Sequence, residues 1–485
     1  MKVLCINPPD DLAALLGDGA SFVSTMEPLG LLYVAAACRE AGHEVAFIDA
    51  YAENLDEETL MRRIRDAAPQ VVSFTSFTSN GGFLYTFGRR LRQEMPGVHV
   101  LLGNVHATIY ARQYLASGCC DVVVRGEGEE VMPALLLVLE EGGDLSTVPS
   151  IAYVRDGVVA ETGGHAFVRD LSTLPLPARD LTRKELYSFA RTPNFSLYRT
   201  PEGKTEKHLF SSRGCVNRCT FCVAHKNIGI RVRPIDSVIG EVDLLLREYD
   251  AGYIFFCDSL FTSRKKRIIE LSDALRHHFP GLRWGCEAHV NTIDEDSVRA
   301  MAAGGCVDMN FGIESGVDRL LTAVNKRQTT AQIADAIRMV KRVSRINAIG
   351  LFILGLPGER PEDSDATIDF ACSLPLDMAQ FSILTPYPGS PIFEQLRAEG
   401  IIDDGVRPGD TLDPEVWRRY SSYASFSDNK PIWVTPEHSV EGLLAAQKRA
   451  LRRFYLRPRP FLIQLRRLRP ADLLDTARTF FKTFF

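Results

Sequence analysis

Three cysteines lie within eight positions of the chain, in the segment SSRGCVNRCTFCVAHKN at residues 211–227. Cys215, Cys219 and Cys222 form a C-x3-C-x2-C pattern. Three closely spaced thiolates can hold three irons of a [4Fe-4S] cube and leave the fourth iron open to an outside ligand. With His225 the run also fits a compact four-ligand zinc site. The open iron–sulfur cluster is favoured, because zinc explains neither the repeats that surround the cysteines nor their polar strand ends.

Length and composition set the class of protein. The chain has 485 residues, 45% hydrophobic and 24% charged, which predicts a soluble globular protein of two or three domains. No stretch approaches the roughly 18 uninterrupted apolar residues of a membrane span. The start, MKVLCINPPD, lacks the pattern of a secretory signal, and the 11 cysteines are an odd number spread along the chain. These features predict reduced thiols and a cytoplasmic location.

The first 140 residues alternate apolar strand-like and polar helix-like segments, which predicts a doubly wound, Rossmann-like parallel sheet. Ligands of such sheets bind beyond the carboxyl ends of the strands. Small and polar residues occupy those ends: Thr75, Ser76, Gly103, Asn104, His106, Gly126 and Glu127. The α/β domain therefore has a predicted binding edge.

A second βα series begins after a proline-punctuated connector at residues 141–204. Six βα repeats within residues 205–404 fit an incomplete (β/α)6 barrel of the TIM type, where chemistry belongs at the carboxyl ends of the strands. Those ends carry the cysteines, Asp258 and Ser259, Glu287 and His289, Glu314 and Ser315, Gly355 to Glu359, and Thr385 and Tyr387. Residues 405–485 are predicted to form a small, mostly helical, basic region.

At the cysteines the sequence resembles the radical S-adenosylmethionine (SAM) superfamily, whose signature has this spacing and an aromatic residue, here Phe221, before the third cysteine. The resemblance implies that SAM chelates the open iron and is cleaved by one electron to a 5'-deoxyadenosyl radical. It also implies contacts to SAM from FGIES (Glu314, Ser315) and GLFILGLPGE (Gly355, Pro357). Lys326 either neutralises the SAM carboxylate or is a solvated helix residue. Glu287, His289 and Tyr387 are candidates to face the substrate, with structural roles as the alternative.

The N-terminal domain, with PLGLLYVAAACREAGHEVAFIDA, GNVHAT and VVRGEGEE, resembles the cobalamin-binding domain of B12-dependent radical SAM enzymes. The polar strand ends named above are the residues that this resemblance places against cobalamin; a nucleotide pocket or a purely structural domain are the alternatives. One departure concerns cobalt. Many B12 folds carry D-x-H-x-x-G after the first strand, whereas this chain reads NPPDDLAALLGDG and has no histidine before His43. This loop therefore offers cobalt no imidazole.

The resemblance implies a C-methyltransferase that methylates an unactivated carbon of a small molecule. Cob(I)alamin would take a methyl group from one SAM, and the radical from a second SAM would activate the substrate carbon. A cyclase without methyl transfer, as in anaerobic bacteriochlorophyll synthesis, shares the domain order and stays open. A corrin-binding regulatory protein is the non-enzyme alternative. A flavodoxin or ferredoxin is the expected electron donor.

The C-terminal tail is basic and aromatic. From Lys448 onward there are 11 Lys and Arg against 2 Asp, a net +9, while the whole chain is at −5, which leaves −14 for the rest. Such a segment can pack its apolar faces on the barrel with solvated arginines, or lie on an anionic membrane and suit a lipophilic substrate. Nucleic acid is not the expected partner, since phosphate-reading motifs are missing.

Overall fold

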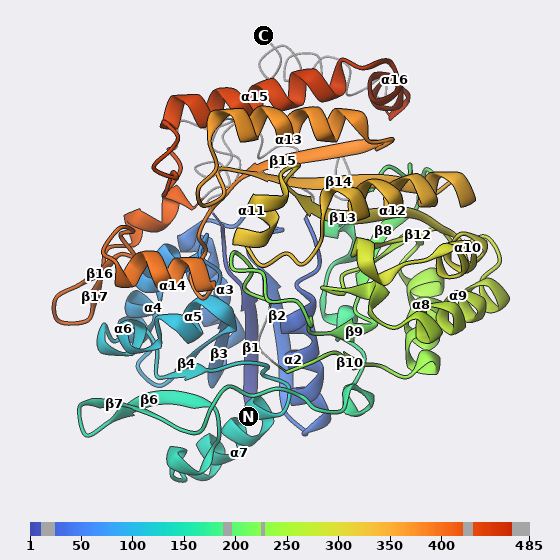
Figure 1. Ribbon diagram of the computed structural model, residues 1–485. Helices are drawn as coiled ribbons and strands as arrows, with labels where there is room; N and C mark the ends of the chain where they lie inside the picture. Colours follow the sequence, from blue (N-terminus) through green and yellow to red (C-terminus); the bar gives the residue numbers. More distant parts are fainter. Residues whose placement is uncertain (11–24, 188–195, 225–227, 421–429, 468–485) are drawn as a thin grey trace. The chain divides into compact units, whose positions relative to one another are not determined.

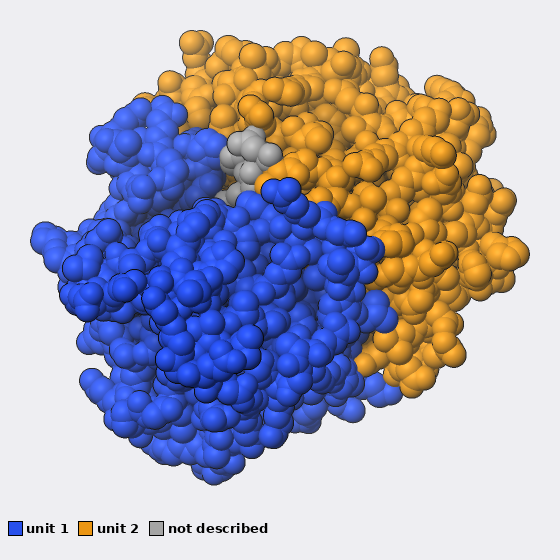
Figure 2. Space-filling model, turned by 90° about the horizontal axis from the view of Figure 1, so that it is seen from below, with its two compact units in different colours: residues 1–12, 25–187, 387–420 blue, residues 13–24, 188–386, 421–485 orange. Residues whose placement is uncertain are grey.

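The computed structural model describes residues 1–10, 25–187, 196–224, 228–420 and 430–467. The chain divides into two compact units, which Figure 2 colours separately. The described part of unit 1 comprises residues 1–10, 25–187 and 387–420, and that of unit 2 comprises residues 196–224, 228–386 and 430–467. His225 of the alternative zinc site lies outside the described residues.

Unit 1 is built on a seven-stranded sheet in the order β2-β1-β3-β4-β5-β6-β7. The first five of these strands in the chain are parallel, and the parallel α/β fold predicted for the N-terminal region is confirmed. Apolar runs such as KVLCIN form these strands because helices cover both faces of the sheet. The parallel strands are β1 (Lys2–Asn7), β2 (Glu44–Asp49), β3 (Val71–Thr75), β4 (His99–Gly103) and β5 (Val122–Val124). The helices are α2 (Leu29–Glu40), α3 (Glu57–Ala67), α4 (Gly81–Glu94), α5 (Asn104–Ile109), α6 (Ala111–Ala116) and α7 (Val131–Glu141).

An antiparallel hairpin from the predicted connector completes this sheet. β6 (Ile151–Arg155) pairs with β5, and β7 (Val158–Glu161) pairs with β6. Asp156 and Gly157 form the two-residue turn with φ of 52° and 76°. An Asp-Gly dipeptide between apolar runs is a typical hairpin signal. The connector therefore extends the sheet rather than only linking two domains.

A segment that follows the last barrel strand also belongs to unit 1. It contains α14 (Pro391–Ala398), the short pair β16 (Val406–Arg407) and β17 (Thr411–Leu412), and the 3-10 helix η8 (Pro414–Arg419). The Leu412 backbone N–H donates to the Tyr85 hydroxyl at 3.3 Å, and the Tyr110 hydroxyl donates to the Asp404 carbonyl at 3.2 Å. Contacts with α4 and with Tyr110, which lies between α5 and α6, thus hold the segment in this unit.

Unit 2 is a half-barrel of six parallel strands in the order β8-β11-β12-β13-β14-β15, which confirms the predicted partial barrel. Neighbouring strands follow one another in the chain, with helices on the outer face (Figure 1). The strands are β8 (Thr205–Leu209), β11 (Ala251–Phe256), β12 (Trp284–Ala288), β13 (Cys306–Glu314), β14 (Asn347–Leu354) and β15 (Met378–Ile383). The helices are α8 (Ile235–Glu248), α9 (Lys265–His278), α10 (Glu295–Ala303), α11 (Asp318–Ala323), α12 (Thr330–Val343), α13 (Pro361–Ser373), α15 (Val440–Tyr455) and α16 (Pro458–Arg467).

One face of each barrel strand packs on the helices. Alternate residues such as Cys286 and Ala288 of β12 belong to the hydrophobic core, so the residues between them face the lumen. α15 runs alongside α13 and buries Leu443 and Phe454 against the same core (Figure 1). Among the described residues, no helix combines the length and the apolarity needed to cross a bilayer.

Candidate active site

The cysteine loop begins at the carboxyl end of the first barrel strand and is flanked by a short antiparallel pair, β9 (Ser212–Arg213) and β10 (Arg231–Val232). Asp258, fully buried at the end of β11, accepts hydrogen bonds from the Ser211 and Ser212 hydroxyls at 2.7 and 2.5 Å. Gly214 has φ of +97°, and a Cβ there would collide with the Gly229 carbonyl oxygen. The loop therefore leaves the barrel in a fixed path, and Asp258 is a structural anchor.

The three cysteines of this loop carry thiol side chains, with Cys219 buried and the other two partly buried. Burial raises the pKa of the Cys219 thiol to about 11 and also raises the pKa of Cys222, so a strong positive charge is needed to keep them as thiolates. Within the described residues no three His, Cys, Asp or Glu side chains already surround one metal position. The fit to an iron–sulfur cluster rests on the donor set: three sulfurs, with backbone N–H groups of Asn217 and Ala224 donating to Cys215 and Cys222 at 3.4 and 3.3 Å.

A turn at residues 324–328 holds the cysteine loop and two other strand ends together. The Thr220 N–H donates to the Val324 carbonyl at 3.1 Å, and Asn325 Nδ2 donates to the Arg218 carbonyl at 2.9 Å. The loop after β12 joins through Asn291 Nδ2, which donates to a backbone carbonyl of this turn at 2.9 Å. The sequence gives little signal for this turn, because two of its non-glycine residues, at positions 325 and 327, adopt a left-handed φ of 54°.

Lys326 projects from this turn into a buried ion pair. Its Nζ lies 2.6 Å from Glu314 Oε1, and the two side chains are 10% and 8% exposed. Burial alone would lower the pKa of Lys326, but Glu314 and the thiols of Cys219 and Cys222 raise it. A Cβ on Gly312 would lie 2.6 Å from both charged atoms, so only glycine leaves room for the pair. The structure places Lys326 beside the cysteines rather than on a solvated helix face.

Glu287 and His289 lie at the end of β12, next to this pair. Burial raises the pKa of Glu287 to about 7, and Lys326 opposes that rise. Asn310 Nδ2 donates to Glu287 Oε1 at 3.3 Å, while the fully buried Asn310 Oδ1 has no hydrogen-bond partner among the described residues. His289 Nδ1 accepts from the Asn291 N–H at 3.2 Å, and burial lowers the pKa of His289 to about 4. These groups form a polar lining next to a charged pair, in which Glu287 can change its protonation state near neutral pH.

The remaining candidates for SAM have structural partners. Ser315 Oγ lies 3.2 Å from Thr367 Oγ1 and accepts from the Val317 N–H. Gly355 has φ of +81° and packs under Leu443 of α15. Pro357 lies in the turn that Glu359 closes by accepting from the Leu356 N–H at 2.9 Å, and Phe221 is partly buried in the cysteine loop. Their contacts with SAM stay predictions.

In unit 1 the candidates for cobalamin lie at the carboxyl ends of β3, β4 and β5. Asn104, with φ of 79°, donates from Nδ2 to Thr75 Oγ1 at 3.0 Å. A Cβ on Gly103 would meet nothing within 4 Å, whereas Ser76 is fully buried. Small polar groups and open space at Gly103 fit the approach of a large ring to the backbone, which is the fit expected for cobalamin.

His106 lies inside an aromatic cluster instead of at the rim. Its ring is 4.3 Å from the Trp417 ring and 4.7 Å from the Tyr110 ring, centroid to centroid, and Nδ1 lies 3.1 Å from the Tyr114 hydroxyl. Burial lowers the pKa of His106 to about 3. A Cβ on Gly81 would lie 2.5 Å from His106 Cε1, so this glycine admits the ring. The cluster gives the imidazole a packing role, which the sequence did not reveal.

Gly126 and Glu127 hold the chain that follows β7. A Cβ on Gly126, at φ of +101°, would collide with Ala166, and Glu127 Oε2 accepts from the Val168 N–H at 2.8 Å. Tyr387 belongs to unit 1, where its hydroxyl lies 3.5 Å from the Tyr420 carbonyl. The structure therefore does not bring Tyr387 together with Glu287 and His289 within one unit.

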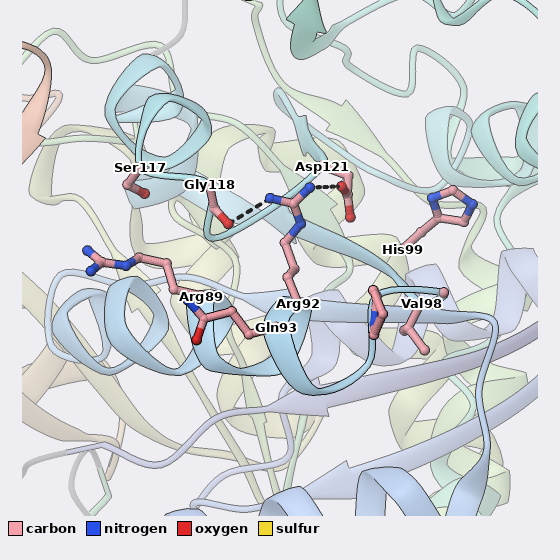
Figure 3. A pocket seen from close by; sticks show the side chains of 10 residues that line it. Arg89, Arg92, Gln93, Val98, His99, Ser117, Gly118 and Asp121 are labelled. Carbon is pink, nitrogen blue, oxygen red and sulfur yellow. Dashed lines mark hydrogen bonds and ion pairs between the residues drawn. The ribbon is translucent and has the colours of Figure 1, made fainter.

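A cavity of about 570 Å³ lies at the opposite edge of the unit 1 sheet, where β4 and β5 begin. Arg92 spans it by donating to the Gly118 carbonyl and pairing with Asp121, both at 2.7 Å (Figure 3). Arg89 and His99 complete its polar wall. The cavity contains none of the candidate residues, and its central arginine is already neutralised, so we do not assign the active site to it.

Comparison with known proteins identifies the two domains. Residues 16–136 match the B12 binding domain model, and residues 209–371 match the radical SAM superfamily model. An uncharacterized methyltransferase of Pyrococcus horikoshii is 32% identical over 95% of this chain and 93% of its own length. The anaerobic magnesium-protoporphyrin IX monomethyl ester cyclase of Rubrivivax gelatinosus is 28% identical over 82% of this chain and 70% of its own length.

Among solved structures, the radical SAM methyltransferase TsrM of Kitasatospora setae, with cobalamin and a [4Fe-4S] cluster bound, matches the fold. Its TM-score is 0.67 at 18% identity, covering 97% of this chain and 89% of TsrM. The chain belongs to the cobalamin-dependent radical SAM enzymes. Cobalamin, SAM and a [4Fe-4S] cluster, the three predicted cofactors, are those of this family.

Proposed function

We propose that the protein is a methyltransferase that adds a methyl group to an unactivated carbon of a small molecule. The relative that matches 95% of the chain is named a methyltransferase, and the similarity runs through both domains. The structural observation that carries the proposal is the buried Lys326–Glu314 pair tethered beside the three cysteines. A reduced, cytoplasmic setting with a flavodoxin or ferredoxin as electron donor suits such a site.

When bound, the cluster with SAM supplies a hydrogen-abstracting radical, and cobalamin supplies methyl transfer. Cys215, Cys219 and Cys222 would hold three irons of the cluster, and Phe221 would pack beside it. Thr75, Asn104 and Gly103 would receive cobalamin through small side chains and exposed backbone. Ser76, Gly126 and Glu127 would support this edge without contacting cobalamin. Ser76 is fully buried, Gly126 packs against Ala166, and Glu127 accepts a hydrogen bond from the Val168 N–H.

Lys326 and Glu314 would bind polar groups of SAM. The ammonium of Lys326 suits the SAM carboxylate, and the carboxylate of Glu314 suits an N–H of the SAM amino group or a ribose hydroxyl. In the present structure each charge neutralises the other at 2.6 Å. The SAM carboxylate would replace Glu314 beside Lys326, while Glu314 would accept hydrogen bonds from the amino group or the ribose. Neither protein charge is then left without a partner, which keeps the desolvation cost low.

Glu287, with Asn310 behind it, would orient the substrate. A carboxyl with a pKa of about 7 can hold a proton near neutral pH and donate a hydrogen bond, or release it and accept one. His289, whose Nδ1 is engaged by the Asn291 N–H, is fixed in orientation beside Glu287. Such groups can fix the position of a target carbon, and accurate positioning contributes much of the rate enhancement of enzymes.

The second candidate is a radical cyclase. It is favoured by the similarity to the anaerobic cyclase of Rubrivivax gelatinosus, which spans 82% of the chain. The residues described above would serve a cyclase equally, because both reactions begin with a carbon radical.

The experiment uses anaerobically purified, reconstituted protein with methyl-deuterated SAM, a strong reductant and a small-molecule extract as substrate source. Formation of S-adenosylhomocysteine and 5'-deoxyadenosine together, with the deuterated methyl in a new product, supports the methyltransferase. 5'-Deoxyadenosine and an unlabelled product, without S-adenosylhomocysteine, would instead establish the cyclase. Absence of both nucleosides would overturn both candidates.

A further inference from the structure

The last described helix, α16, exposes apolar side chains on one face. Phe461, Leu462 and Leu465 are 37%, 50% and 46% exposed, and Leu456, just before the helix, is 55% exposed. Positions 461, 462 and 465 share one helical face, because residues three and four apart are neighbours on a helix. Pro460, on another face, is buried. α16 therefore packs by one side and presents a second apolar side outward. We call Phe461, Leu462 and Leu465 the α16 face.

The sequence on both sides of this face is rich in cations. Residues 442–467 contain eight Lys and Arg and no Asp or Glu. Arg449, Arg453 and Arg459 pair with aspartates of the barrel. The exposed side chains of Lys448, Arg452 and Arg466 make no ion pair with any described residue. The positive charge is local, since the chain before residue 448 is at −14.

We propose that the α16 face docks the protein on an anionic lipid bilayer. An interfacial helix combines exposed Phe and Leu with flanking Lys and Arg, so that the apolar side chains enter the acyl boundary while the cations meet lipid phosphates. A second copy of the chain would bring the same unpaired cations together, which like-charge repulsion opposes. A nucleic acid would use the arginines but leave the leucines without a partner. This inference does not depend on the proposed reaction.

The test is co-sedimentation of the full chain with vesicles of phosphatidylcholine, with or without phosphatidylglycerol. We expect binding to the anionic vesicles that weakens with added salt, because surface charge is screened within about 10 Å at 0.1 M salt. The triple variant F461S/L462S/L465S should bind at least about 10-fold more weakly, since it removes most of the inserted apolar surface. The double variant R452E/R466E should lose the preference for phosphatidylglycerol.

Two control variants keep the test specific. L137S/V158S changes two similarly exposed apolar residues of unit 1, at 52% and 64% exposure, and should bind like the unchanged protein. F480S/F481S/F484S/F485S changes only the terminal aromatic residues of the sequence. All variants should unfold at the same temperature as the unchanged protein, since the altered α16 and unit 1 side chains are exposed.

Several results would overturn the proposal. It is wrong if the α16 triple variant binds anionic vesicles unchanged, or if only the terminal aromatic variant loses binding. It is also wrong if the unchanged protein ignores vesicles but forms a dimer that the triple variant dissolves in light scattering, because the α16 face is then a self-interface. Binding to DNA in place of vesicles would equally reject it.

Discussion

Unit 1 and unit 2 both place polar residues at the carboxyl ends of parallel strands, but they treat those residues differently. In unit 1 one of the polar residues predicted to lie at this edge, His106, is neutral near pH 7 and enclosed by Trp417, Tyr110 and Tyr114. In unit 2 the corresponding edge holds two opposite charges, Lys326 and Glu314, that neutralise each other close to the cysteines. His106 is thus held by aromatic packing, whereas Lys326 and Glu314 are held by a buried ion pair.

This difference fits the ligands that the two edges would bind. A corrin ring is large and is reached by backbone and small residues, so unit 1 gains by burying its imidazole and leaving Gly103 and Asn104 at the rim. SAM would bring its own carboxylate and hydrogen-bond donors, so a charge pair in unit 2 could exchange its internal partner for these groups. A single buried charge has a high desolvation cost, and pairing Lys326 with Glu314 lowers that cost.

The largest expected effect comes from the cysteines. Changing Cys215, Cys219 or Cys222 singly to Ala removes one of three donors, and we expect loss of the cluster and of 5'-deoxyadenosine formation. Iron and sulfide analysis with visible absorption would check this. Cys372→Ala, a partly buried thiol on α13, is the matched control and should keep both cluster and activity. If any of the three variants retained a full cluster, the cysteine changed in it would not be a cluster ligand, and the assignment of the cluster to this loop of unit 2 would be wrong.

Trp417→Ala tests the packed edge of unit 1. Trp417 is buried against three aromatic rings and donates from Nε1 to the Asp404 carbonyl at 3.2 Å. Removing it should lower the free energy of unfolding of unit 1 by about 3–5 kcal/mol, from lost burial and the cavity left behind. Hydrogen exchange in residues 104–116 should rise strongly, with little change in β11–β13. Equal increases in hydrogen exchange in both regions would contradict this prediction, because they would show that Trp417 stabilises both units and not unit 1 alone.

Much of this organisation was predictable because its signals are local. The alternation of apolar strands and polar helices predicted the sheet and the half-barrel, and the cysteine spacing predicted which loop would hold the cluster. The hairpin of β6 and β7 also had a local signal, Asp156-Gly157, which the prediction of a connector over residues 141–204 overlooked. The burial of His106 could not be predicted, because Trp417 lies far along the chain. Nor could the turn at 324–328, whose left-handed residues are Asn325 and Arg327 rather than glycines.

Lys326→Met tests whether the ion pair of unit 2 serves SAM binding as well as stability. It leaves Glu314 buried without a partner, and we expect a loss of about 3 kcal/mol in the free energy of unfolding, together with weaker SAM binding. The double variant K326M/E314Q should recover most of the stability but not the SAM binding. Urea unfolding and equilibrium binding of SAM, measured on all four proteins of this double-mutant cycle, separate the two effects. If the double variant also recovers SAM binding, the pair is only structural.

The smallest effect is the pH dependence that His106 gives to unit 1. Its pKa is about 3 when folded and 6.5 when exposed, so below pH 6.5 the unfolded chain takes up a proton that the folded chain refuses. Stability is therefore present above pH 6.5 and falls towards pH 3, by about 2–3 kcal/mol between pH 7 and pH 4.5. His106→Gln cannot titrate, so its stability should fall less over this range although it starts lower. His277→Gln, at an exposed position on α9, should follow the unchanged protein in urea unfolding at each pH. Parallel pH curves for the unchanged protein and His106→Gln would contradict this prediction, because they would show that folding leaves the pKa of His106 unchanged and that the cluster accepts a protonated imidazole below about pH 6.5.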